Sequence, residues 1–370
     1  MLPSITPFLE DLEARINPAA ETALYAEWTE FVEGRYKGGG AFSPRRPAPS
    51  RTKIDWPTIK THEAINDFEL MAIQQLKECS GSLQKGSGLL MNIRSNYGTS
   101  ILPSLFGVEL FNMDGEFDVL PTSHPLAGGT AAVRKIIDAG VPSQFNVSLA
   151  GRALETAARF KEMVWPYTNI RRYVYNYHPD LQGPLDVCEV LWGGELFTTM
   201  IDDPDLVETF LDLLTDTYIA YMKEWNKIFP FRTPCTAHWG LLIKGHIMLR
   251  NDSAMNFSGR MYEKRFRKYD QKLLDAFGGG AVHACGKLDH YLDSVTSMSG
   301  LSGIQMSQPE YNDMKKVLAL TIERGVPLLG LPPQTARELI DSGVDLRGRV
   351  HSDLGDGFGA GSLKDAPKRK

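Results

Sequence analysis

The residues best placed to do chemistry are His283 and Cys285, at the end of the apolar run GGGAVHACG (278–286). Because alternate side chains of a β-strand point to one face, these two are expected to point the same way, where glycines leave room for a ligand. An imidazole beside a thiol can form half of a zinc site. It can also be an acid–base histidine beside a reactive cysteine. A buried cysteine with a backbone-bonded histidine would give the same pattern.

Other polar residues follow the remaining expected strands. Asp252, Glu310 and His178 are the candidates for acid–base roles. Each also has a structural explanation: Asp252 as a partner of Arg250, Glu310 as a first-turn carboxylate, and His178 as part of a turn before Pro179. The candidates for substrate contacts are Arg94, Asn96, Tyr97, Tyr177, His238 and Arg250.

The elements that must position these residues alternate between strand and helix patterns. Strands are expected at 88–94, 172–177, 236–240, 246–250, 281–284, 302–307, 326–330 and 349–351. Helices are expected at 151–165, 187–199, 204–226, 260–277, 287–298, 310–324 and 333–342. This alternation is typical of parallel βα units. About eight strands, with no glycine-rich nucleotide motif, favour an α/β fold of the (β/α)8 TIM-barrel type. Chemistry in such barrels lies where strands end, which is where the polar residues concentrate.

Three regions are expected along the chain. Residues 1–85 form an N-terminal helical extension, with helices at 5–35 and 61–78 and an exposed connector, GGGAFSPRRPAPSR, at 38–51. Residues 86–357 form the barrel, and the basic tail 358–370 is expected to be disordered.

Composition excludes several classes of protein. A net charge of -5 gives no basic footprint, so no nucleic acid partner is expected. Four scattered cysteines fit a reducing cytoplasm, and the acidic N-terminus does not resemble a signal peptide. No apolar stretch reaches the length of a membrane span. The sequence therefore indicates a soluble, cytoplasmic protein that acts on a small molecule, with its oligomeric state left open.

Several segments together resemble a known superfamily. They are QGPLDVCEVLWG (182–193), DDPDLVETFL (202–211), Asp252, residues 258–262, residues 266–269 and VHACG (282–286). In this order they resemble the uroporphyrinogen decarboxylase (URO-D) superfamily over residues 86–355, and its cobalamin-linked methyltransferase branch more than its decarboxylases. The resemblance implies a (β/α)8 barrel.

The chain departs from the decarboxylases in two places. Their early arginine-rich motif has only a loose counterpart in RSNYG (94–98), and Asp356 in DLGDG (353–357) stands where they have a histidine. Both departures weigh against uroporphyrinogen as the substrate.

The methyltransferase branch implies zinc held by the His-x-Cys pair and a distant third cysteine. No cysteine follows Cys285 here, so the third ligand is expected to be Glu310, His351 or Asp356. The resemblance then implies a zinc-dependent methyltransferase that takes its methyl group from a corrinoid carried by a partner protein. Two alternatives remain: a decarboxylase that anchors an acidic substrate with Arg94 and Arg250, and a non-catalytic relative that binds a corrinoid or substrate.

Overall fold

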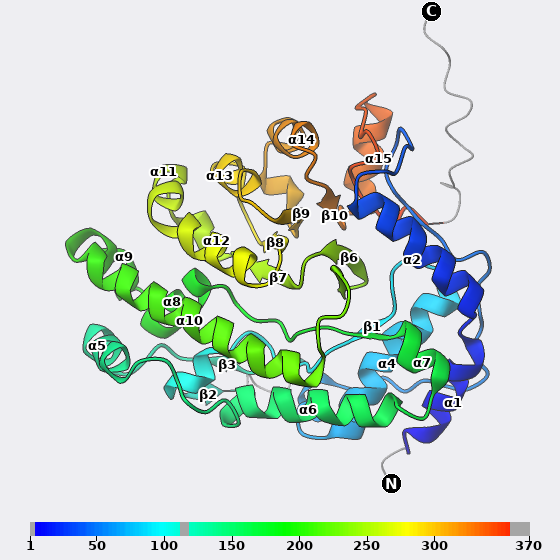
Figure 1. Ribbon diagram of the computed structural model, residues 1–370, viewed down its shortest axis with the longest axis horizontal. Helices are drawn as coiled ribbons and strands as arrows, with labels where there is room; N and C mark the ends of the chain where they lie inside the picture. Colours follow the sequence, from blue (N-terminus) through cyan, green and yellow to red (C-terminus); the bar gives the residue numbers. More distant parts are fainter. Residues whose placement is uncertain (1–3, 112–117, 356–370) are drawn as a thin grey trace, which may run out of the picture.

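The computed structural model describes residues 4–111 and 118–355 (Figure 1). Its N-terminal part is helical, as expected, with α1 (Thr6–Arg15), α2 (Pro18–Val32), α3 (Thr61–Ala64) and α4 (Phe68–Lys85). Asn17 caps α2 by accepting hydrogen bonds from the backbone N–H groups of Ala19 and Ala20, and Asp67 caps α4 through Leu70 N. Helix α4 ends at Gly86, whose φ of 60° suits a residue without a Cβ.

A four-stranded parallel sheet forms the centre of the second half of the chain. Its strands are β7 (Ile247–Arg250), β8 (Gly280–Ala284), β9 (Leu301–Met306) and β10 (Leu328–Leu329), in the order β10-β9-β8-β7. A parallel bridge from Leu328 to Val350, and another from His351 to Phe42, continue the pairing beyond β10. The expected alternation of strands and helices is confirmed here, and the fold is α/β.

The remaining strands form short pairs. β1 (Asn92–Ile93) lies parallel to β4 (Tyr175–Asn176), and β2 (Leu110–Phe111) lies antiparallel to β3 (Thr122–Ser123). Within the described residues no ladder of backbone hydrogen bonds joins β4 to β7. A side chain makes a link there instead, because Met248 N donates to His178 Nε2 over 3.1 Å. A complete eight-stranded barrel therefore stays a prediction.

One expected strand belongs to a different kind of unit. Residues 236–240 were expected as a parallel βα strand, but β5 (Cys235–His238) pairs antiparallel with β6 (Leu241–Lys244). Trp239 and Gly240 form the two-residue turn, and both have positive φ, 50° and 78°. This turn geometry matches the twist of a β-hairpin, which reverses the chain.

Eleven further helices lie in the described part of the chain. They are α5 (Gly129–Ala139), α6 (Ser148–Val164), α7 (Thr168–Tyr173), α8 (Pro184–Trp192), α9 (Glu195–Asp202), α10 (Pro204–Ile228), α11 (Gly259–Met261), α12 (Arg267–Ala276), α13 (Leu292–Thr296), α14 (Met314–Glu323) and α15 (Pro333–Asp341). Figure 1 shows α12, α13 and α14 along the outside of the parallel sheet, with α6 and α10 side by side across the molecule. The described residues contain no helix with both the length and the apolar character to cross a bilayer.

A group of buried aromatic rings joins the N-terminal helices to the last strands. Trp28 of α2 is fully buried, donates from Nε1 to Gly88 O over 2.8 Å, and lies 4.6 Å from the His351 ring. Phe31 and Phe42 stack beside it with their centroids 4.4 Å apart. Helix α2 thus packs against the sheet. The three-region division of the chain stays a prediction, and the expected tail lies outside the described residues.

Candidate metal centre

Two neighbouring strands bring Asp252, His283 and Cys285 together. Arg250, the last residue of β7, lies opposite His283 of β8, so the residues that follow each strand leave the sheet at the same edge. The backbone N–H of Cys285 donates to Asp252 Oδ1 over 2.7 Å. This bond fixes the Asp252 carboxylate beside the end of β8. The three side chains therefore lie at the carboxyl edge of the sheet, as expected for a working site in βα folds.

The ligand atoms of these three residues lie within 4.8 Å of one another. Cys285 Sγ is 3.3 Å from His283 Nε2, and that nitrogen is 3.5 Å from Asp252 Oδ1. His283 Nδ1 hydrogen-bonds Gln305 Oε1 on β9. An amide oxygen only accepts, so Nδ1 carries the proton and the Nε2 lone pair faces Cys285 and Asp252. The group presents one nitrogen, one sulfur and one oxygen donor.

The surroundings set the charges of the three groups. Burial lowers the pKa of His283, and Asp252 has the opposite, smaller effect. The lowered pKa favours the neutral imidazole, which is the form that binds metals. Burial, and then the nearby Asp252 carboxylate, raise the pKa of the Cys285 thiol. The thiol consequently keeps its proton at neutral pH unless a cation takes its place.

Asp186, which was not expected in the site, supports this group from α8. It accepts hydrogen bonds from Asp252 N (3.2 Å) and Ser253 N (2.7 Å), which hold the turn after β7. Burial and the neighbouring Asp252 charge raise its pKa. Gly183 lets α8 begin this close to β7, since an added Cβ would lie 2.2 Å from Arg250 O. The signal in the sequence was an aspartate in the first turn of a helix whose other residues are mostly apolar.

A second polar group lies beside the first, centred on the buried Asp180. Arg94 and Arg250 both pair with its carboxylate, Arg250 Nη2 at 2.7 Å, and His238 Nε2 lies 3.8 Å from its other oxygen. Both guanidinium groups expected to bind substrate thus already have a protein carboxylate as partner. Asp180 is one of the polar residues that follow an expected strand, but no role was assigned to it, because nothing in the sequence shows which strand ends face each other.

Trp239 connects the two polar groups. Its ring centroid lies 5.0 Å from that of His283, and the Arg250 guanidinium lies 4.9 Å from the Trp239 ring. The hairpin turn that holds Trp239 therefore covers one side of His283.

Neither ring nitrogen of His238 has a hydrogen-bond partner within the described structure, and burial lowers its pKa well below the usual value.

The other expected substrate residues make mainly internal contacts. His178 uses both ring nitrogens, towards Pro179 O and Met248 N, and burial lowers its pKa to about 4. Tyr177 packs edge-on against His238, with ring centroids 4.4 Å apart. Asn96 accepts from Arg94 Nε, and the Tyr97 hydroxyl hydrogen-bonds Thr156 of α6. Tyr97 therefore faces the helix layer.

The residues expected as a third metal ligand are not part of the three-residue group. His351 packs against Trp28 and Phe42, accepts from Gly330 N, and has its pKa lowered to about 4 by burial. Glu310 lies exposed in the short turn Pro309–Tyr311. Asp356 lies outside the described residues. The structure places Asp252, expected as an acid–base residue, beside His283 and Cys285 instead.

Comparisons with known proteins extend this description at the level of the fold. No known family matches the sequence, and no curated protein matches it. Among solved structures, a methyltransferase from Methanosarcina mazei superposes with a TM-score of 0.61. The match covers 90% of this chain and 93% of that chain, at 18% sequence identity. The two chains share a fold, and the assignment to the URO-D superfamily stays a prediction.

Proposed function

We propose that this protein is a zinc-dependent methyltransferase that accepts its methyl group from a corrinoid carried by a partner protein. The observation that carries the proposal is the group of Asp252, His283 and Cys285 at the carboxyl ends of β7 and β8. The shared fold with a methyltransferase supports it. A closed (β/α)8 barrel and membership of the corrinoid-linked branch belong to the same proposal.

The donor set fits zinc. Nitrogen, sulfur and oxygen ligands from three residues are the kind of set found in catalytic zinc sites, which keep a fourth position for water or substrate. Gln305 holds the His283 ring so that Nε2 faces the other two donors, as orienting partners of metal-bound histidines do. Zinc bound there would lower the pKa of an acceptor group at the open position, so that a nucleophile is available for the methyl group.

The chain's own residues would orient and shield the acceptor. Asp186 fixes the turn that carries Asp252, so the carboxylate keeps its place beside Cys285. Trp239 covers one side of His283, and Arg250 lies against Trp239. This ring would exclude water from one side of the metal, and water exclusion strengthens the electrostatic interactions inside a site. Arg94 and Arg250 share the single carboxylate of Asp180, which leaves one positive charge beside the site.

Metal content and turnover test the proposal together. After expression with zinc, the protein is expected to hold about one zinc per chain, bound by the three-ligand group found among the described residues. Cys285→Ser should lose most of the zinc and most of the methyl transfer from methylcobalamin, because a hydroxyl is a far poorer zinc ligand than a thiolate. Cys235→Ser is the matched control, since Cys235 is half-buried but not in the group. Zinc is measured by mass spectrometry.

Two results would refute the proposal: a wild-type protein without metal after this treatment, or a Cys285→Ser variant with full metal and full transfer. A protein that holds zinc but shows no turnover would support the non-catalytic alternative. The decarboxylase alternative gains less from the geometry, because its expected carboxylate anchors, Arg94 and Arg250, share the carboxylate of Asp180.

A further inference from the structure

A cavity of about 850 Å³ lies away from the metal centre. It runs along β4, from Arg171 before the strand to His178 after it, and reaches His246, which precedes β7. Asp252 of the metal centre follows the other end of β7. Asp252 lies six positions after His246, which in an extended chain corresponds to roughly 20 Å. Residues of β4 and β5 line the cavity, and none of the β7 residues does.

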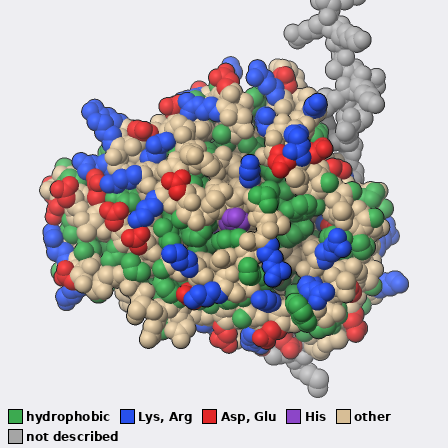
Figure 2. Space-filling view, in the orientation of Figure 1, with side chains coloured by type: hydrophobic (Ala, Val, Ile, Leu, Met, Phe, Trp, Pro, Cys, Tyr) green, Lys and Arg blue, Asp and Glu red, His purple; other side chains and the backbone are tan. Residues whose placement is uncertain are grey.

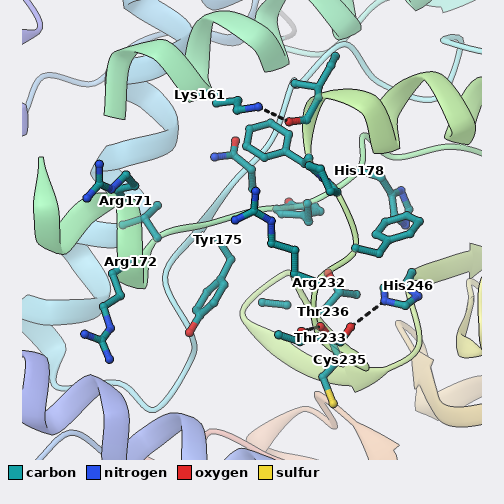
Figure 3. Close-up of a pocket in the computed structure, with 18 of the residues that line it drawn as sticks. Lys161, Arg171, Arg172, Tyr175, His178, Arg232, Thr233, Cys235, Thr236 and His246 are labelled. Carbon is teal, nitrogen blue, oxygen red and sulfur yellow. Dashed lines mark hydrogen bonds between the residues drawn. The ribbon is translucent and has the colours of Figure 1, made fainter. Parts of the chain in front are cut away.

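The cavity is lined by positive charge without negative charge. Lys161, Arg171, Arg172 and Arg232 line it, and no aspartate or glutamate is among its described lining residues. None of the four cations forms a salt bridge with a described carboxylate; Lys161 donates to Ile228 O and Arg171 to Trp165 O. Figure 3 shows Arg171 and Arg172 on one side of the cavity, Thr233 and Cys235 on the other, and the Arg232 side chain extending between them. Such a concentration of one charge attracts an anion.

The walls between the cations are apolar and aromatic. Trp165 is 63% exposed, and the Arg171 guanidinium lies 4.7 Å from its ring. Tyr175, Trp225 and Phe231 form deeper parts of the wall. Figure 2 shows Lys and Arg side chains bordering apolar surface over the middle of this face. An exposed tryptophan in an apolar cavity of this size is typical of a small-molecule site, since large apolar side chains are usually covered.

We propose that this cavity binds an organic anion with a planar apolar body and a carboxylate or phosphate group. The body would lie against Trp165 and Tyr175, and the acid group would face Arg172 and Arg232. Asn176 Oδ1 also lines the cavity, is buried, and has no hydrogen-bond partner among the described residues. It would accept a hydrogen bond from a hydroxyl or N–H group of the ligand, because a buried acceptor without a partner is costly.

Calorimetric titration with three compounds that share one apolar body tests the charge requirement. The full-length protein is titrated with 2-naphthyl phosphate, 2-naphthoate and 2-naphthol. Both anions are expected to bind more tightly than the neutral naphthol, and the stronger of the two identifies the acid group that the cavity prefers. Equal binding of naphthol and both anions, or no binding of either anion up to about 1 mM, would overturn the proposal.

Substitutions locate the bound anion. The double variant Arg172→Gln, Arg232→Gln should weaken binding of the better anion by roughly tenfold or more, since charge-assisted hydrogen bonds are lost. Arg260→Gln removes the same charge from an exposed position outside the cavity and should leave binding unchanged. His283→Ala should also leave it unchanged, whatever its effect on metal content. Undiminished binding by the double variant, or loss of binding with His283→Ala, would show that the anion lies elsewhere.

Discussion

At the scale of single residues, the buried Asp270 makes the stability of the protein depend on pH. Its carboxyl accepts hydrogen bonds from the Tyr262 hydroxyl (2.7 Å) and Asn251 Nδ2 (2.9 Å). Burial is the main cause that raises its pKa to about 7, and Asp186 adds to it. The folded protein therefore holds a proton that the unfolded chain releases near pH 4. Because the native state binds the extra proton, this group's contribution to stability falls as pH rises from about 4 to about 7.

The variant Asp270→Asn removes this titration while it keeps the size of the side chain. Between pH 5 and pH 8, the wild type's free energy of unfolding should fall by roughly 2 to 3 kcal/mol more than that of the variant, from the linkage of a pKa near 7. Urea unfolding at the two pH values measures the difference. Asp275→Asn, an exposed change on the same helix, keeps Asp270 and should therefore parallel the wild type at both pH values. An Asp270→Asn variant that parallels the wild type at both pH values would contradict the assignment.

Residue types in the sequence predicted part of the candidate site, and spatial proximity decided the rest. The i, i+2 spacing of His283 and Cys285 predicted that they lie together, and their donor atoms are 3.3 Å apart. Asp252 was expected near them, but in another role, because its place beside Cys285 depends on the register of β7 against β8. Asp186 was missed and Asp180 was given no role, since local sequence does not reveal which helix start or strand end faces a given neighbour.

At the scale of elements, glycines allow the parallel strands to start close together. Gly279 precedes β8 with a φ of 98°, and a Cβ added there would lie 2.5 Å from Gly300 O, just before β9. The clash involves backbone, so a side chain cannot simply move aside. Gly279→Ala is expected to lower the free energy of unfolding by about 2 to 4 kcal/mol, from positive φ and overpacking together.

Gly325→Ala separates the two causes. Gly325 also has a positive φ, 70°, but nothing lies within 4 Å of its added Cβ. Only the backbone strain remains, so a loss of about 1 kcal/mol is expected. Denaturant unfolding of both variants gives the comparison. Equal losses would mean that the contact with Gly300 contributes nothing.

Turn chemistry explains where the element predictions failed. The strand expected at 236–240 contains Trp239-Gly240, a two-residue hairpin turn, and a glycine at the second turn position was the available signal. The turn was not predicted because Trp239 has a positive φ, a conformation that bulky residues rarely adopt. The strand expected at 172–177 is only Tyr175–Asn176, since α7 extends to Tyr173. Helix α5 was not expected at all.

At the scale of the whole molecule, Trp28 ties the N-terminal helices to the last strand. It is fully buried against Phe31, Phe42 and His351. Trp28→Ala should lower the free energy of unfolding by about 3 to 5 kcal/mol, as expected for a large buried ring. Trp165→Ala, at a position that is 63% exposed, should change it by less than about 0.5 kcal/mol. A small effect of Trp28→Ala would mean that α2 folds independently of the sheet.

The sequence predicted the βα architecture of the molecule better than its closure. The alternation of strands and helices from 247 to 341 is regular because the strands are mostly buried and the longer helices are amphipathic, so their periodicities differ. The number of expected strands, about eight, then predicted a closed barrel. The count could not show that β1 and β4 are two residues long, or that the His178 ring stands where a backbone partner of Met248 would be expected.

The contact between Trp28 and His351 also has a consequence for folding during synthesis. The ribosome synthesises α2 long before residue 351. About 320 residues separate Trp28 from His351, and their synthesis takes roughly 15 to 60 s at common elongation rates. During that interval Trp28, Phe31 and Phe42 have no sheet to cover them. Their exposed rings would be a natural target for chaperones that bind nascent chains, and slower synthesis would lengthen that exposure.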